Sequence, residues 1–393
     1  MLKRMSDNSQ KKLKKRIILG AGFSYALGYP LGSELLKDIE DFYKFLKSDN
    51  SITDIHEKKK EEFKSKIGID NLETLLRTLS EFPDESIDST ISKLPKEFIE
   101  KVELKKVMWT IVTSYQHYHD DSNGGCYNKM YRKFANNLLP SLESGDKDNL
   151  LNIVKKHLEN NPIQIITFNY DVSLEYYLLR FIKSQYAENV SNDIQDDIFK
   201  EICKTIHHVY GSLRDIDFMI TEGVNYTNTR QLQDFFNGRI SETRGVSEHL
   251  YYAYFANNVS RNSNPDNMEN SKYNTCYEIL TQLDCIKKEE WDGIKLIGEE
   301  RNDRIATNVK NLLKTPSEET YILGFGFDKT NSTTILGFDE NGKDKNLHGE
   351  IYITNFGNNI RIAKLINKYF GSGLATVSYN SACDALQTEF PLS

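Results

Sequence analysis

The chain has 393 residues, of which 38% are hydrophobic and 27% charged, and its formal net charge is -7. This length allows one large domain with insertions or two domains, and the hydrophobic fraction supports a folded core. The acidic balance argues against a surface that binds nucleic acid non-specifically. No apolar run reaches the roughly 20 residues of a membrane span. The basic N-terminus lacks the apolar segment and cleavage site of a secretory signal, so we expect a cytoplasmic protein that makes no membrane contact.

The cysteines are odd in number, scattered along the chain and without a CxxC pair. They are Cys126, Cys203, Cys276, Cys285 and Cys383. This pattern predicts neither a zinc ribbon nor a disulfide framework, and we expect no bound metal.

Residues 1–16 are polar and end in a basic run, which predicts a solvated N-terminal arm or a local contact with a partner or a phosphate. The apolar run Ile17–Leu19 stops at Gly20, as a buried parallel strand does. Ser33 is a suitable N-cap for the helix that follows, whose apolar stripe extends to Leu46.

The remaining chain alternates between helical and strand patterns. A charged, mostly helical region at about 50–160 predicts a helical insertion, in which Leu72, Leu75, Leu76 and Leu79 share one face. The stretch at about 214–290 predicts a polar loop insertion. Further strands are expected at 163–168, 205–209, 294–297, 321–325 and 351–354. This alternation predicts an α/β fold of Rossmann type, with a doubly wound parallel sheet and one domain over 17–393.

A glycine-rich turn follows the first expected strand. It consists of Gly20, Ala21, Gly22, Phe23 and Ser24. Without Cβ atoms in the way, backbone amides can approach a pyrophosphate here, although the glycines also suit a turn that is merely tight. Tyr25 stands where a dehydrogenase fingerprint has its third glycine, which argues against hydride transfer.

Polar residues follow the next expected strands. Asn169 and Asp171 come after 163–168, where they either hold a ribose or carboxamide or simply form a turn and cap the next helix. His207 and His208 point to opposite faces of their strand, so only one can enter a given cleft, as a general base or as a structural group.

The last two expected strand ends repeat this pattern. Gly324 and Gly326 follow strand 321–325, and Thr354 and Asn355 follow strand 351–354. These residues suit either contacts to a nucleotide or ordinary strand-to-helix turns.

These segments have the order and spacing of the sirtuin fold, and the sequence resembles the sirtuin-like NAD hydrolases of bacterial anti-phage defence. GAGFSYALGYP, ending at Pro30, resembles GAG-x-S-x-x-x-G-x-P, and TFNYD resembles T-x-N-x-D. The resemblance implies that Asn169 positions ribose or water and that Asp171 binds the nicotinamide amide. ILGFGF resembles the later nucleotide turn of the family, and ITN, ending at Asn355, its adenosine-contacting strand end.

The segment HHVYGSL resembles the one in which a catalytic histidine precedes Gly-Ser, but Tyr210 stands directly before Gly211. Some defence proteins have an H-x-H-G form, whose first histidine His208 matches. We therefore expect His208 in the site, with His207 as a substitute or Tyr210 filling the catalytic position. The sequence departs from the family pattern in two further ways: it has no zinc module, and it lacks the arginine that the family has near the position of Leu31.

The resemblance implies an NAD hydrolase that uses NAD as substrate, water as nucleophile and no metal, and that yields nicotinamide and ADP-ribose. It also implies control by a homo-oligomer or by a partner such as a HerA-type ATPase, an Argonaute or a sensor, without direct binding to nucleic acid. The alternatives are a module that binds NAD or ADP-ribose without cleaving it, and a protein deacylase or ADP-ribosyltransferase.

Overall fold

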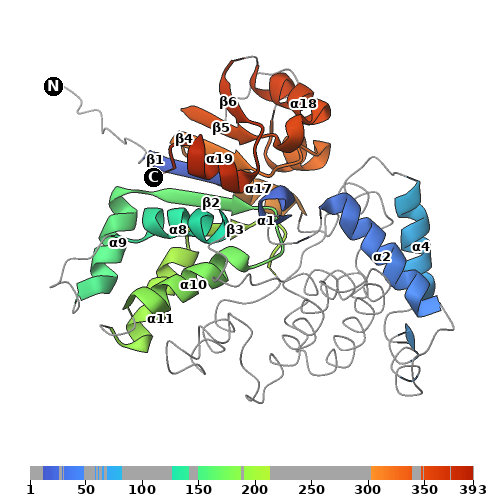
Figure 1. The fold of residues 1–393 in the computed structure, drawn as a ribbon, viewed down its shortest axis with the longest axis horizontal. Helices are drawn as coiled ribbons and strands as arrows, with labels where there is room; N and C mark the ends of the chain where they lie inside the picture. Colours follow the sequence, from blue (N-terminus) through green and yellow to red (C-terminus); the bar gives the residue numbers. More distant parts are fainter. Residues whose placement is uncertain are drawn as a thin grey trace, which may run out of the picture.

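The described part of the chain is built on a six-stranded, all-parallel sheet (Figure 1). The computed structural model describes residues 12–25, 29, 31–47, 69–81, 126–140, 149–186, 190–212, 302–338, 347, 349–371 and 373–392, with isolated positions between 58 and 65. The strands are β1 (Leu13–Leu19), β2 (Ile163–Thr167), β3 (Ile206–His208), β4 (Ser317–Leu323), β5 (Glu350–Thr354) and β6 (Ala375–Ser378). Their order, β3-β2-β1-β4-β5-β6, is that of the Rossmann fold, which confirms the predicted α/β class.

The central strands are apolar because both faces of the sheet are covered. Every residue of β2 is buried, and β1 buries its last four residues. Ile17 pairs in register with Ile165 of β2 and with Tyr321 of β4. This register brings the carboxyl ends of the three central strands to one edge of the sheet.

Figure 1 shows the arrangement of the helices. They are α1 (Ala21–Tyr25), α2 (Gly32–Lys47), α4 (Ile69–Ser80), α8 (Cys126–Leu138), α9 (Leu150–Asn160), α10 (Ser173–Tyr186), α11 (Asn192–Cys203), α17 (Asn302–Leu313), α18 (Ile360–Phe370) and α19 (Ala382–Thr388). A π-helix spans Thr330–Ile335 and a 3-10 turn Phe356–Asn358. Helices α8 to α11 lie beside β2 and β3, α18 lies beside β5 and β6, and α2 packs against α4 away from the sheet.

The N-terminal boundary differs from the prediction, because β1 begins at Leu13 and not at residue 17. Arg16, which the sequence placed in a solvated arm, is fully buried. Its guanidinium donates to Gln164 at 2.9 Å and to the carbonyl oxygens of Leu312 and Thr315 at 3.0 and 2.5 Å. A basic run does not reveal such partners, since they come from residues far along the chain.

Two further elements correct the expected organisation. Helix α8 lies within the predicted insertion, yet it packs against α10 and α19 and places Phe134 in the core. It therefore belongs to the layer that covers the sheet. Strand β6 was not predicted, because only Ser378 of its four residues is buried and the apolar signal is weak.

Several sequence predictions fall outside the described residues: the strand at 294–297, the loop at 214–290 and Pro30. Among the described helices, none has the length and apolar character needed to cross a membrane. Cys203 is a buried free thiol, whereas Cys383 is disulfide-bonded, a pairing that the scattered cysteines did not predict.

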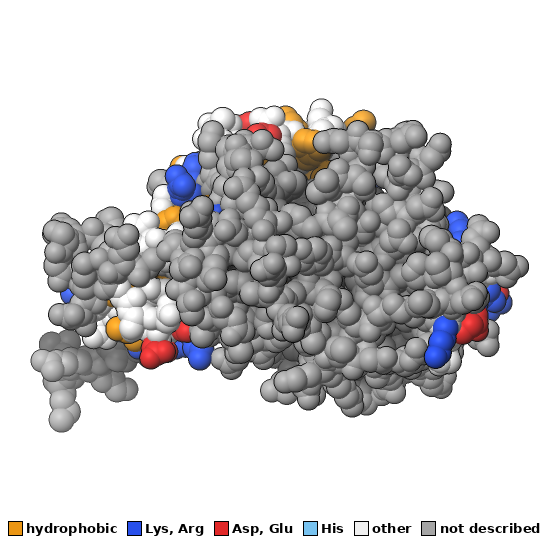
Figure 2. Space-filling model, turned by 60° about the horizontal axis from the view of Figure 1, so that its bottom comes forward, with side chains coloured by type: hydrophobic (Ala, Val, Ile, Leu, Met, Phe, Trp, Pro, Cys, Tyr) orange, Lys and Arg blue, Asp and Glu red, His pale blue; other side chains and the backbone are white. Residues whose placement is uncertain are grey.

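Charges of both signs occur together on the described surface. Lys44 lies 4.0 Å from Glu40 within α2, and Lys47 lies 3.2 Å from Glu73 of α4. At this edge of the molecule, on the right of Figure 2, basic and acidic side chains lie next to each other. Exposed pairs of this kind contribute little to stability, because water and salt screen them.

Candidate functional site

The turns after β1 and β4 meet backbone to backbone at the point where the strand order reverses. The amide of Gly20 donates to the carbonyl oxygen of Leu323 at 3.0 Å, and that of Gly22 donates to Gly324 at 2.9 Å. A Cβ atom on Gly20 would lie 2.6 Å from the Gly324 oxygen, and one on Gly22 would lie 2.9 Å from it. Both glycines are therefore required by the contact between the two turns.

Gly324 is the tightest position of this contact. Its φ is +62°, and a Cβ atom there would lie 2.1 Å from the Phe23 nitrogen. Its amide donates to Thr354 Oγ1 of β5 at 2.8 Å. Gly326 differs, because a Cβ atom there has no neighbour within 4 Å among the described atoms.

These bonds reduce the number of backbone amides in the first turn that could bind a phosphate. Three of the five backbone amides in this turn donate within the protein: those of Gly20, Gly22 and Phe23. The Phe23 amide donates to the Gly20 carbonyl oxygen at 2.8 Å. In this conformation those three amides are not available to a phosphate. The edge of the sheet between β1 and β4 is nevertheless where Rossmann folds bind their ligands.

Asn169 and Asp171 follow β2 at the carboxyl edge of the sheet, where the sequence predicted them, and the structure places them beside the first turn. Asn169 Nδ2 donates to Ser24 Oγ at 2.9 Å, although the two residues are 145 positions apart. Asp171 accepts from the Ser173 amide at 3.2 Å and from the Ser173 hydroxyl, so it also caps the start of α10. Burial raises the pKa of Asp171, and hydrogen bonds from Ser173 and Ser24 oppose that effect.

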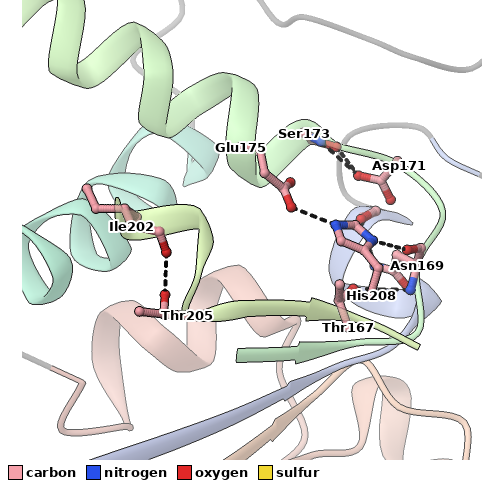
Figure 3. A network of polar contacts seen from close by, with 9 residues as sticks. Thr167, Asn169, Asp171, Ser173, Glu175, Ile202, Thr205 and His208 are labelled. Atoms are coloured by element: carbon pink, nitrogen blue, oxygen red, sulfur yellow. Dashed lines mark hydrogen bonds and ion pairs between the residues drawn. The ribbon is translucent and has the colours of Figure 1, made fainter. Parts of the chain in front are cut away.

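His208 completes this cluster from β3 (Figure 3). Its Nδ1 lies 3.0 Å from the backbone oxygen of Asn169, and its Nε2 lies 2.6 Å from Glu175 Oε1 on α10. The side chains of His208 and Glu175 are only 13% and 6% exposed. Burial lowers the pKa of His208, but Glu175 and the Asn169 carbonyl raise it more, so the net direction is upward.

A cavity of about 10 Å³ lies within this cluster. Its polar lining consists of Ser24, Thr167, Asn169, Asp171, Glu175 and His208. Leu19, Phe23 and Leu174 supply the apolar part. This volume is enough for about one water molecule, and the lining offers it several hydrogen-bond partners.

Other candidate residues lie elsewhere. His207 does not line the cavity, since neighbouring residues of a strand face opposite sides of the sheet, and burial lowers its pKa. Tyr210 is 1% exposed and its hydroxyl donates to Asn331 of the π-helix, while Gly211 takes a φ of +73° in the turn that follows. Asn355 exchanges two hydrogen bonds with the backbone of Asn359, both at 3.1 Å.

Sequence reasoning missed Glu175. It lies four residues after Asp171, in the first turn of α10, which is a common place for an acidic residue because of the helix dipole. Only the strand pairing of β2 with β3 brings it to His208. A pattern of Asn, Asp and Glu at 169, 171 and 175 ahead of a histidine at a strand end was the available signal.

Fold and site together define a Rossmann-type α/β protein with a buried polar cluster at the carboxyl ends of β1, β2 and β3. Within the described residues, no three His, Cys, Asp or Glu side chains are arranged to hold a metal ion. No protein-family model matches the sequence, and no curated protein matches it.

Proposed function

We propose that this chain is an NAD hydrolase with a sirtuin-like variant of the Rossmann fold. One observation carries the proposal: Asn169 donates to Ser24 at 2.9 Å. That bond joins the glycine turn to the Asn–Asp segment at one cavity, which Asp171 also lines. The glycine turn is the expected contact for the pyrophosphate, and the resemblance assigns Asn169 and Asp171 to the nicotinamide ribose and carboxamide. These are neighbouring parts of NAD, and the fold supports the assignment by bringing the two segments together.

In the proposed reaction, a water oxygen bonds to C1′ of the nicotinamide ribose. Nicotinamide leaves with the electron pair of the C–N bond, which neutralises its ring, and the water proton passes to solvent. Asn169 would orient the water or the ribose, and Asp171 would hold the leaving carboxamide. The products are nicotinamide and ADP-ribose.

The size of the cavity supports a role in placing water. About 10 Å³ suits one water molecule but not a nicotinamide ring. The nicotinamide ribose would therefore bind against the outer side of Asn169 and Asp171, after some opening of the site. Control of such opening by an oligomer or by a partner such as a HerA-type ATPase fits an effector of anti-phage defence, because uncontrolled NAD loss would kill the cell.

A second candidate function is an NAD or ADP-ribose-binding module without hydrolysis. The observation that favours it is that neither candidate base is free. His208 has both ring nitrogens engaged, and Tyr210 donates its hydroxyl to Asn331. A general base must reach the proton that it removes, which neither residue does in this conformation.

The test is release of nicotinamide from NAD, measured by chromatography on the full chain, alone and with the product of the neighbouring gene. We expect release by the wild type and a loss of about 100-fold in Asn169→Ala, the size of effect seen when one transition-state contact is removed. Asn152→Ala, on the exposed face of α9, is the matched control and keeps full release.

Binding of NAD measured by calorimetry separates the two candidates. Tight binding with no release by any sample supports the binding module and rejects the hydrolase. Absence of both binding and release rejects both functions. Equal release by the wild type and Asn169→Ala removes Asn169 from the reaction.

A further inference from the structure

We propose that Glu175 holds His208 as a doubly protonated imidazolium, and that this buried ion pair positions Asn169. His208 is then a positioning residue and not the general base. The inference rests on the proposed function for its effect on NAD, but the contact between the two side chains is a property of the described structure (Figure 3).

The hydrogen-bond partners determine where the protons lie. A carbonyl oxygen can only accept, so the contact of 3.0 Å between His208 Nδ1 and Asn169 requires a proton on Nδ1. On the other side, Nε2 lies 2.6 Å from Glu175, within the range of a short, charge-assisted bond. A ring between two acceptors satisfies both only when both nitrogens carry protons. The upward pKa of His208 agrees with this state.

The pair controls Asn169 through its backbone. The Asn169 amide donates to Thr167 Oγ1 at 3.1 Å, and its carbonyl accepts from His208. With the peptide groups on both sides of the Cα atom held, the direction of the side chain toward Ser24 is set. If the hydrogen bond from His208 is lost, the Asn169 carbonyl is no longer held, and the side-chain amide of Asn169 can then turn away from Ser24.

Other titratable groups near the pair interact with it electrostatically. Asp171 comes from the segment before α10, Tyr131 from α8 and Cys203 from α11. His207 is the neighbour of His208 in β3, although its side chain faces the other side of the sheet. The Asp171 carboxyl raises the pKa of His208. The pKa of the Cys203 thiol is raised mainly by burial and to a smaller extent by the nearby Glu175. Both His208 ring nitrogens already have partners, so these groups influence the pair electrostatically and not through a hydrogen bond to the ring.

A pH dependence follows from this arrangement. When the pH rises above the elevated pKa of His208, Nε2 loses its proton and its lone pair faces the Glu175 carboxylate. The two repel, and the bond to Asn169 weakens. In Glu175→Gln the side-chain amide can donate to Nε2 of a neutral ring, so the geometry is kept without the charge.

The first experiment measures the protonation of His208 by nitrogen NMR of the histidine-labelled full chain. We expect a wild-type pKa above the ordinary value of about 6.5, and a fall of at least about one unit, a tenfold change in proton affinity, in Glu175→Gln. Asp196→Asn disturbs the other buried pair of α10, in which Lys183 lies 2.5 Å from Asp196, and leaves the pKa of His208 unchanged. A neutral wild-type ring at pH 6 overturns the proposal.

The second experiment measures the pH profile of NAD cleavage. We expect wild-type activity to fall on the alkaline side, Glu175→Gln to lack that fall, and Glu175→Ala to lose at least about tenfold at every pH, equivalent to about 1.4 kcal/mol. Asp196→Asn keeps the wild-type profile. Identical profiles for the wild type, Glu175→Gln and Glu175→Ala overturn the positioning role.

A readout without NAD separates this proposal from the proposed function. Hydrogen exchange of the Asn169 side-chain amide reports its bond to Ser24 directly. We expect exchange at least about tenfold faster in Glu175→Ala than in the wild type or Asp196→Asn. If the wild type cleaves no NAD but shows this difference, the hydrolase is rejected and the positioning of Asn169 stands. Equal exchange in all three proteins overturns the positioning.

Discussion

Replacement of Gly324 by alanine tests the contact between the turns after β1 and β4. A non-glycine residue at φ +62° costs about 1–2 kcal/mol. The added Cβ atom would lie 2.1 Å from the Phe23 nitrogen, so the two turns must separate. Separation loses the backbone bonds from Gly20 and Gly22, each contributing about 1 kcal/mol. We therefore expect Gly324→Ala to lower the free energy of unfolding by about 3–4 kcal/mol.

Two glycines of the same sheet edge serve as matched controls. Gly357 has a φ of +69° but open space around a Cβ atom, so Gly357→Ala carries the backbone strain alone, about 1–2 kcal/mol. Gly326 has neither a positive φ nor a close neighbour, so we expect Gly326→Ala to leave the free energy of unfolding unchanged or to raise it by up to about 1 kcal/mol. Urea denaturation followed by circular dichroism measures all three. If Gly324→Ala loses no more than Gly357→Ala, the close contact of the two turns is refuted.

Three further predictions concern buried polar groups. Tyr210→Phe leaves the Asn331 oxygen without its donor, so we expect the free energy of unfolding to fall by about 1–3 kcal/mol while nicotinamide release persists. Loss of release with unchanged stability would instead indicate that Tyr210 is catalytic. Asp171→Asn stabilises the protein in urea at neutral pH, because the folded-state pKa of this buried carboxyl is raised and its contribution to stability is lost as the pH rises above the ordinary value of 3.8. The gain vanishes below that value, where the carboxyl is protonated in both states, and a pH-independent difference contradicts this. Asp196→Asn leaves Lys183 buried without its counter-charge and costs up to about 3–5 kcal/mol, against no loss for exposed Glu318→Gln.

The candidate site could be predicted only in part. Asn169 and Asp171 follow a buried strand, and the carboxyl ends of parallel strands share an edge, so their place at that edge was predictable. Their contact with Ser24 depends on the pairing of β1 with β2, which the sequence does not show. The role of His208 was not predictable either. The sequence around a histidine at a strand end does not show whether its ring nitrogens have hydrogen-bond partners. Glu175 comes within hydrogen-bond distance of His208 only because β2 pairs with β3.

The glycines show the same limit. A turn of two glycines after a strand predicts close approach of some backbone or ligand, and the sequence cannot say which. In the folded chain it is the Gly324 backbone that approaches Gly20 and Gly22. Gly324 and Gly326 look equivalent in the sequence, yet the first is enclosed and the second faces open space.

The sequence by itself determined the class of fold, because buried parallel strands have apolar runs and their helices have apolar stripes, both of which are local patterns. It also determined which polar residues stand at the carboxyl ends of those strands. Tertiary structure decided what each of them contacts: Arg16 against helix α17, Tyr210 against Asn331, His208 between Asn169 and Glu175. Those partners lie 33 to 296 residues apart in the chain, and no local pattern encodes a distance of that kind.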